Sequence, residues 1–161
     1  MANNIIDAKV FEDALQEIAA LGFPKHAEAL RTCNIVAKPW WMPWKGMSTT
    51  LNGTIYLGKE WRNWNLVQHL AHEATHLLQQ RNMGMPAFLA AYAQKSGRLR
   101  LEEEAYQVEC HALWRMTGYA WANVQFAINR VIEVLSTKYN LGSWYTQERM
   151  DATAQKLMED L

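Results

Sequence analysis

The sequence is organised around residues 68–80, QHLAHEATHLLQQ, which contain the pattern H-E-X-X-H at residues 72–76. Side chains four residues apart lie on one face of an α-helix, about one turn from each other. His72 and His76 can therefore present two imidazole nitrogens to one metal ion, which is half of a tetrahedral zinc site. Glu73 lies about 100° round the helix from His72, so its carboxylate borders the metal and can take the proton of a water molecule there. This stretch predicts a long helix that carries hydrolytic chemistry.

A catalytic zinc ion needs a third protein ligand and an open position for water. The pattern H-E-X-X-H-X-X-G-X-X-H would supply a third histidine, but Gln79 and Asn82 stand where its glycine and last histidine would be. A glutamate from a second helix is the other common solution. Four glutamates lie in the stretch that follows: Glu102, Glu103, Glu104 and Glu109.

Helical geometry separates these four glutamates. Each residue turns a helix by about 100°, which places Glu102 and Glu109 close to the apolar face of residues 101–116. Glu103 and Glu104 point away from that face, and we expect both to be solvated. A carboxylate on a buried face needs a partner, such as a metal or a ligand histidine. We therefore predict Glu102 as the third ligand, and Glu109 as a carboxylate that supports a ligand or as the alternative third ligand.

Together, residues 72–79 and residues 102–105 resemble the gluzincin type of zinc metallopeptidase. Within this type, the sequence is most similar to small single-domain proteins that contain the motif H-E-X-X-H-X-X-Q followed by E-X-X-A. In this chain Glu102 follows His76 by 26 residues. The resemblance implies a zincin-like fold, hydrolysis of peptide or protein substrates, and Zn²⁺ as the cofactor. It makes His72, His76 and Glu102 the zinc ligands and Glu73 the general base and acid.

One position departs from this family pattern. Many related sequences have aspartate after the alanine of E-X-X-A, where a carboxylate supports a ligand histidine. Tyr106 occupies that position here, after Ala105, which the resemblance makes the small residue that lets the two helices approach. We expect Glu109 to replace the missing carboxylate. A second donor to the substrate oxyanion is usual, and the sequence leaves three candidates open: Tyr106, His111 and Tyr145.

The rest of the chain predicts one α+β domain, residues 1–161, that is mostly helical. Helices are expected at residues 5–20, 24–30, 61 or 63 to 82, 86–94, 98–116, 119–139 and 146–161. Residues 33–37 are expected to form a short buried strand. Residues 49–57 are expected to form a hairpin that turns at Asn52-Gly53. Residues 54–57 would then offer a free edge along which an extended peptide could lie.

Residues 39–46, PWWMPWKG, are kept out of a helix by two prolines and carry three tryptophans. The rings either cover the core or form a platform beside the site for apolar or carbohydrate groups. Such a platform would suit a second possible function, that of a non-catalytic zinc-containing binding or scaffold protein that uses Trp40, Trp41 and Trp44.

Two further interpretations of the motif remain open from the sequence. His111 could be the third ligand, as in small zinc proteases that act near DNA, or the motif could have arisen by chance and bind no metal. His69 either lines the site or is a hydrogen-bonded core histidine.

The charge and hydrophobicity of the sequence indicate which classes of partner are excluded. The chain has 16 basic and 16 acidic residues, and this zero net charge argues against a general nucleic-acid binder. No apolar run approaches the ~20 residues that cross a bilayer, and the N-terminal residues lack a secretion signal. We therefore expect a soluble, cytoplasmic protein. Cys33 and Cys110 form no C-X-X-C pattern and are expected to be buried free thiols.

Overall fold

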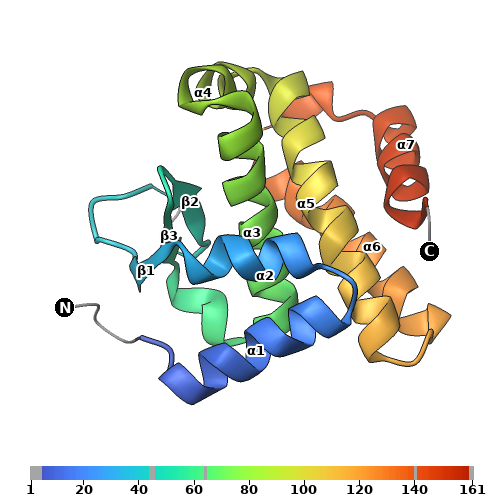
Figure 1. Ribbon diagram of the computed structural model, residues 1–161. Helices are drawn as coiled ribbons and strands as arrows, with labels where there is room; N and C mark the ends of the chain where they lie inside the picture. The colour runs from blue at the N-terminus through green and yellow to red at the C-terminus, as the bar shows by residue number, and fades with distance from the viewer. Residues whose placement is uncertain (1–4, 44–45, 64, 140, 160–161) are drawn as a thin grey trace. The chain divides into compact units, whose positions relative to one another are not determined.

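The computed structural model describes residues 5–43, 46–63, 65–139 and 141–159 (Figure 1). It is an α+β structure that is mostly helical, as predicted. The elements in chain order are α1 (Ala8–Ala20), α2 (Pro24–Arg31), β1 (Asn34–Ala37), β2 (Thr49–Leu51), β3 (Thr54–Leu57), the 3₁₀ helix η1 (Lys59–Asn63), α3 (Leu66–Met83), α4 (Met85–Ala93), α5 (Lys95–Met116), α6 (Trp121–Lys138), the 3₁₀ helix η2 (Gly142–Trp144) and α7 (Gln147–Met158). They form two compact units, Met1–Met85 and Pro86–Leu161. That these act as a single domain stays a prediction.

In the first unit, α1 and α2 lie side by side and both contact α3 (Figure 1). The Asp7 carboxylate begins α1 by accepting hydrogen bonds from the backbone N–H groups of Lys9 and Val10. The apolar side chains that hold these helices together are fully buried. They include Leu15, Ile18, Leu30, Leu70 and Leu77. Burial of this aliphatic layer fixes α3 against the rest of the unit.

The sheet of the first unit has the order β1-β3-β2, with β3 parallel to β1 and antiparallel to β2. The predicted hairpin is confirmed: Asn52 and Gly53 have φ values of 48° and 73°, as a two-residue turn of this kind requires. The prediction that residues 54–57 offer a free edge is wrong, because β1 pairs along β3. The strand at residues 34–37 is present, but it is not buried, since it lies at an edge and its residues are exposed or half-buried.

The helix that carries His72 and His76 begins later than predicted. Residues 59–63 form η1, and the Asn65 side chain accepts hydrogen bonds from the N–H groups of Val67 and Gln68, which starts α3 at Leu66. Its end is as predicted, because Gly84 follows with φ 78°. Eleven residues of α3 are buried, and they include His72, Glu73 and His76.

In the second unit, α5 contacts both α6 and α7. Ser96 and Gly97 were placed between the helices expected at residues 86–94 and 98–116, but they lie in the first turn of α5. A Cβ atom at Gly97 would collide with the carbonyl group of Ala91 in α4. The glycine is therefore needed for the close approach of α4 and α5, and it does not terminate a helix.

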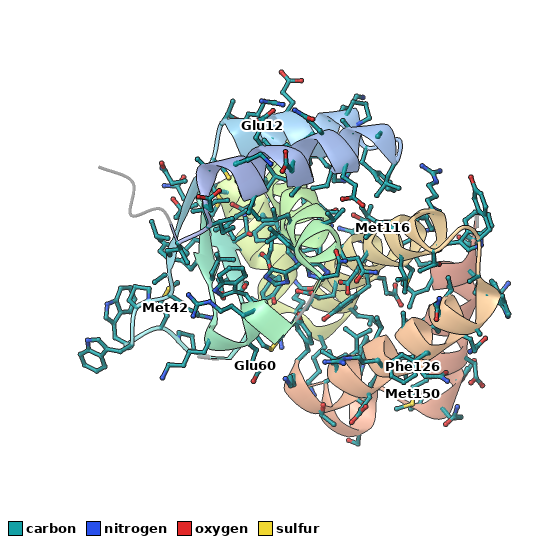
Figure 2. The ribbon with its side chains drawn as sticks, turned by 90° about the horizontal axis from the view of Figure 1, so that it is seen from below. Glu12, Met42, Glu60, Met116, Phe126 and Met150 are labelled. Carbon is teal, nitrogen blue, oxygen red and sulfur yellow. The ribbon has the colours of Figure 1, made fainter. Side chains whose placement is uncertain are left out.

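The aromatic segment before β2 is only partly buried. Trp40 and Trp41 are 81% and 67% exposed, so the interpretation that their rings cover the core is wrong for these two residues. Met42, labelled in Figure 2, is buried and attaches the segment to the unit. Trp44 lies outside the described residues.

The two cysteines are free, as predicted, but only Cys110 is fully buried. Burial raises the pKa of the half-buried Cys33 thiol to about 11, and it raises that of Cys110 further. Both thiols are therefore protonated and unreactive near neutral pH. No helix within the described ranges is long and apolar enough to cross a bilayer.

Candidate metal centre

His72 and His76 lie on one face of α3, where their helical spacing placed them. Both are buried, with 6% of each residue exposed. The centroids of the two rings are 5.0 Å apart and the ring planes meet at 79°. Two imidazoles at this separation can present nitrogens to one ion.

The side chain of Gln79 determines which nitrogen of His76 can bind a metal. Its Oε1 atom lies 2.8 Å from His76 Nδ1, and a carbonyl oxygen can only accept a hydrogen bond. Nδ1 therefore carries the proton, and the lone pair of the neutral ring is on Nε2. This is the way in which a partner outside the ligand set fixes the tautomer of a metal-binding histidine.

Glu73 is only 4% exposed on the same helix, and its carboxylate is held by the sheet. The Thr50 hydroxyl, from β2, donates a hydrogen bond of 2.5 Å to Glu73 Oε2. Short hydrogen bonds of this kind are common between a hydroxyl and a carboxylate. The bond joins two residues 23 positions apart, so the motif alone does not reveal it.

A half-buried cation lies near this carboxylate. Lys38 Nζ donates to the Met47 carbonyl at 2.9 Å and to Thr49 Oγ1 at 2.6 Å. Burial lowers the pKa of Lys38, while the negative charge of Glu73 acts in the opposite direction and raises it. The charge of Glu73 is thus partly compensated within the first unit.

His69, one turn before His72, is a hydrogen-bonded, half-buried histidine. Its Nε2 atom lies 2.7 Å from the Ser48 hydroxyl, which also accepts a hydrogen bond from the Gly58 N–H group. This agrees with one of the two interpretations of the sequence. His69 ties the segment before β2 to α3.

In the second unit, Glu102 is almost fully buried, at 1% exposure, as its position on the apolar face of α5 predicted. The Tyr92 hydroxyl, from α4, donates to Glu102 Oε1 at 2.9 Å. Tyr92 is itself held, because its ring stacks on Phe88 and lies 5.5 Å from the Arg98 guanidinium. The negative charge of Glu102 adds to burial in raising the pKa of Tyr139.

The other glutamates of α5 differ from one another. Glu103 is not solvated, contrary to the prediction, because α7 covers it: Thr153 donates to its Oε1 at 2.6 Å and Lys156 Nζ lies 3.4 Å from its Oε2. Glu104 and Glu109 are half-buried. Helix periodicity could not show where α7 would pack.

The three candidates for an oxyanion donor all lie in the second unit and differ in their contacts. The Tyr106 hydroxyl is 3.5 Å from that of Tyr139. His111 Nε2 lies 2.9 Å from the Glu159 carbonyl oxygen, to which it donates. Tyr145 is buried, which raises its pKa. None of these contacts distinguishes one candidate as the donor.

Among the described residues, His72 and His76 of the first unit and Glu102 of the second are buried and carry donor atoms that could serve as metal ligands. Two imidazoles and one carboxylate are a set that suits zinc. Sequence reasoning missed Thr50 and Tyr92, which contact Glu73 and Glu102 from other elements. Gln79 was recognised only as part of a motif, although its position three residues after His76 could have indicated the contact.

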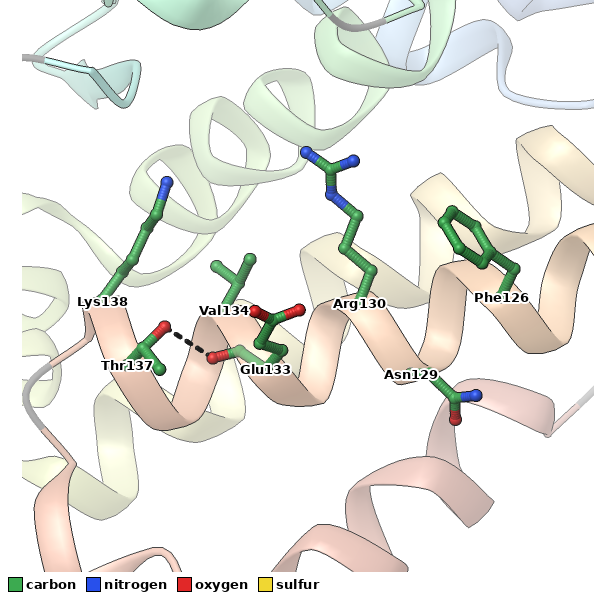
Figure 3. Close-up of a pocket in the computed structure, with 7 residues that line it drawn as sticks. All are labelled: Phe126, Asn129, Arg130, Glu133, Val134, Thr137 and Lys138. Atoms are coloured by element: carbon green, nitrogen blue, oxygen red, sulfur yellow. Dashed lines mark hydrogen bonds between the residues drawn. The ribbon is translucent and has the colours of Figure 1, made fainter.

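A hollow of about 520 Å³ lies along α6 in the second unit (Figure 3). Its lining mixes exposed aromatic, charged and polar side chains, and Thr137 Oγ1 donates to the Glu133 carbonyl at 2.7 Å. The lining residues are Phe126, Asn129, Arg130, Glu133, Val134, Thr137 and Lys138. They include one carboxylate and neither histidine nor cysteine, so this hollow does not resemble a metal site.

No protein-family model, curated protein or solved structure matches the chain. The chemistry of the site therefore rests on its own residues.

Proposed function

We propose that the protein is a zinc-dependent metallopeptidase of the gluzincin type, with a zincin-like fold, that hydrolyses peptide bonds in a peptide or protein substrate. The observation that carries this proposal is the contact between His76 Nδ1 and Gln79 Oε1. It leaves the Nε2 lone pair for a ligand, on a helix where His72 and Glu73 are also buried.

Glu102 is the third ligand in this proposal. Its carboxylate is almost fully buried, and a buried charge is stable only when it is compensated. The Tyr92 hydroxyl donates a hydrogen bond to this carboxylate. A divalent cation bound together with His72 and His76 would compensate its charge further.

A bound zinc ion would lower the pKa of a coordinated water molecule and polarise the carbonyl group of the substrate. Glu73 accepts the proton from the attacking water and returns it to the leaving amine. Gln79 orients His76, and Tyr92 orients Glu102.

Metal content of the purified protein tests the site. We expect about one zinc per chain in the wild type and after Glu104→Ala, which changes a half-buried carboxylate of the same helix. Glu102→Ala should lose the metal. Loss after Glu109→Ala, with zinc retained after Glu102→Ala, would make Glu109 the ligand instead. A wild type that takes up no zinc on reconstitution would contradict the proposal.

The exposed rings of Trp40 and Trp41 favour a second candidate, a zinc-containing binding or scaffold protein without catalysis. Large apolar side chains that face solvent often mark a contact surface. This candidate predicts one zinc per chain but no hydrolysis of any peptide. Replacement of both tryptophans by alanine would then abolish its function while the metal is retained.

A further inference from the structure

Strand β2 contacts the carboxylate of Glu73 through the hydroxyl group of Thr50. Thr50 lies opposite Ile55 in the register of β2 and β3, so the two side chains point to the same face of the sheet. β2 contacts α3, and both of these side chains are buried. From this face the Thr50 hydroxyl reaches Glu73 Oε2 at 2.5 Å and lies 3.5 Å from the Glu73 carbonyl oxygen.

Thr50 is itself fixed by α3. Gln80, two turns after Glu73, donates from Nε2 to the Thr50 carbonyl at 2.8 Å, and its Oε1 accepts from the Asn52 N–H group at 2.9 Å. One amide therefore holds the backbone on both sides of Leu51. The hydroxyl of Thr50 is held in place by this clamp and by pairing with β3. A donor fixed in this way restricts the rotation of the carboxylate that it contacts.

We propose that Thr50 is a positioning residue that orients the general base, an inference that rests on the proposed peptidase function. The hydroxyl binds Oε2 and so directs Oε1 of Glu73 towards the water whose proton it takes. Thr50 does not touch the substrate in this scheme and acts only through Glu73. Because a base must lie within hydrogen-bond reach of its proton, loss of the tether should slow turnover without affecting metal binding.

The substitution Thr50→Val removes the hydroxyl and keeps the shape of the side chain. We expect kcat on a library of internally quenched peptides to fall about 10- to 100-fold, with KM and zinc content unchanged. Thr50→Ser, which keeps the donor, should retain most of the activity. Thr54→Val is the matched control, since Thr54 lies on β3 next to Ile55 and points to the opposite face of the sheet. If Thr50→Val does not fold, Thr50→Ala carries the same test.

A second measurement needs neither metal nor activity. The ¹³C resonance of the Glu73 carboxyl carbon, assigned by its loss in Glu73→Gln, should shift in metal-free Thr50→Val and return in Thr50→Ser. A resonance that does not move would overturn the contact itself. A resonance that moves while kcat stays at the wild-type value would overturn the positioning role. If the wild type cleaves no library peptide, the peptidase proposal and this role fall together, while the resonance still reports whether the contact exists.

Discussion

The two units hold their candidate metal ligands in different ways. In the first unit, two functional side chains of α3 are fixed by a neighbour: Gln79 holds His76, and Thr50 holds Glu73. In the second unit, one carboxylate, Glu102, is held by a tyrosine from the preceding helix. In the proposed mechanism the first unit provides the base in a fixed orientation, whereas the second provides one carboxylate. Changes in the two units should therefore differ in what they affect.

The largest expected effect is on catalysis and lies in the first unit. Glu73→Gln removes the base but keeps the size of the side chain and its ability to accept a hydrogen bond from Thr50. Hydrolysis should fall by at least about 10³-fold, because general base catalysis and the charge at this position are both lost. Zinc content and the unfolding midpoint should stay close to those of the wild type. Undiminished cleavage by this variant would remove Glu73 from the mechanism.

A smaller effect is expected from the partner of the ligand histidine. Gln79→Leu removes the acceptor for His76 Nδ1 and leaves a side chain of similar size. Zinc affinity should fall about 10- to 100-fold, as when such a partner is lost in other metal sites. A competition assay with a chromophoric chelator measures this change. Gln79→Glu, which keeps an acceptor, is the control and should bind zinc at least as tightly.

The smallest expected effect is in the second unit. Tyr92→Phe removes the hydroxyl that donates to Glu102 Oε1 and keeps the ring stacked on Phe88. Zinc affinity should change by less than about tenfold, because the metal would still compensate the carboxylate. The same chelator assay applies. A loss larger than that of Gln79→Leu would reverse the comparison and show that the second unit controls metal binding.

Much of this arrangement could be predicted from local signals. The periodicity of residues 101–116 placed Glu102 on a buried face, and Asn52-Gly53 specified the hairpin turn. Asn65 caps the start of α3, and Gly84 caps its end. The start was predicted a few residues too early, because the sequence does not distinguish η1 from the first turn of α3.

Contacts between distant elements could not be predicted in this way. A free edge was predicted for residues 54–57, but β1 pairs with β3 there. The two strands are separated by a long connection, and no local sequence pattern indicates that they pair. Glu103 was expected in solvent because α7, about 50 residues later, covers it. Thr50 was missed for the same reason: a threonine in a strand shows nothing by itself of the carboxylate that it will meet on a later helix. The motif therefore predicts the reactive groups but not the side chains that orient them.

The side-chain amide of Gln80 also limits the pairing of β2 with strands of other protein chains. In a two-residue hairpin the carbonyl of Thr50 and the N–H of Asn52 point away from β3, towards the outer edge of the sheet. An unoccupied edge of this kind invites another strand to add to it and promotes aggregation. Because Gln80 already bonds both groups, it imitates an added strand with a single side chain. A peptide that pairs with β2 can therefore use only backbone groups that precede the Thr50 carbonyl in the chain. The end of β2 next to the turn is not available for pairing with a second copy of the protein.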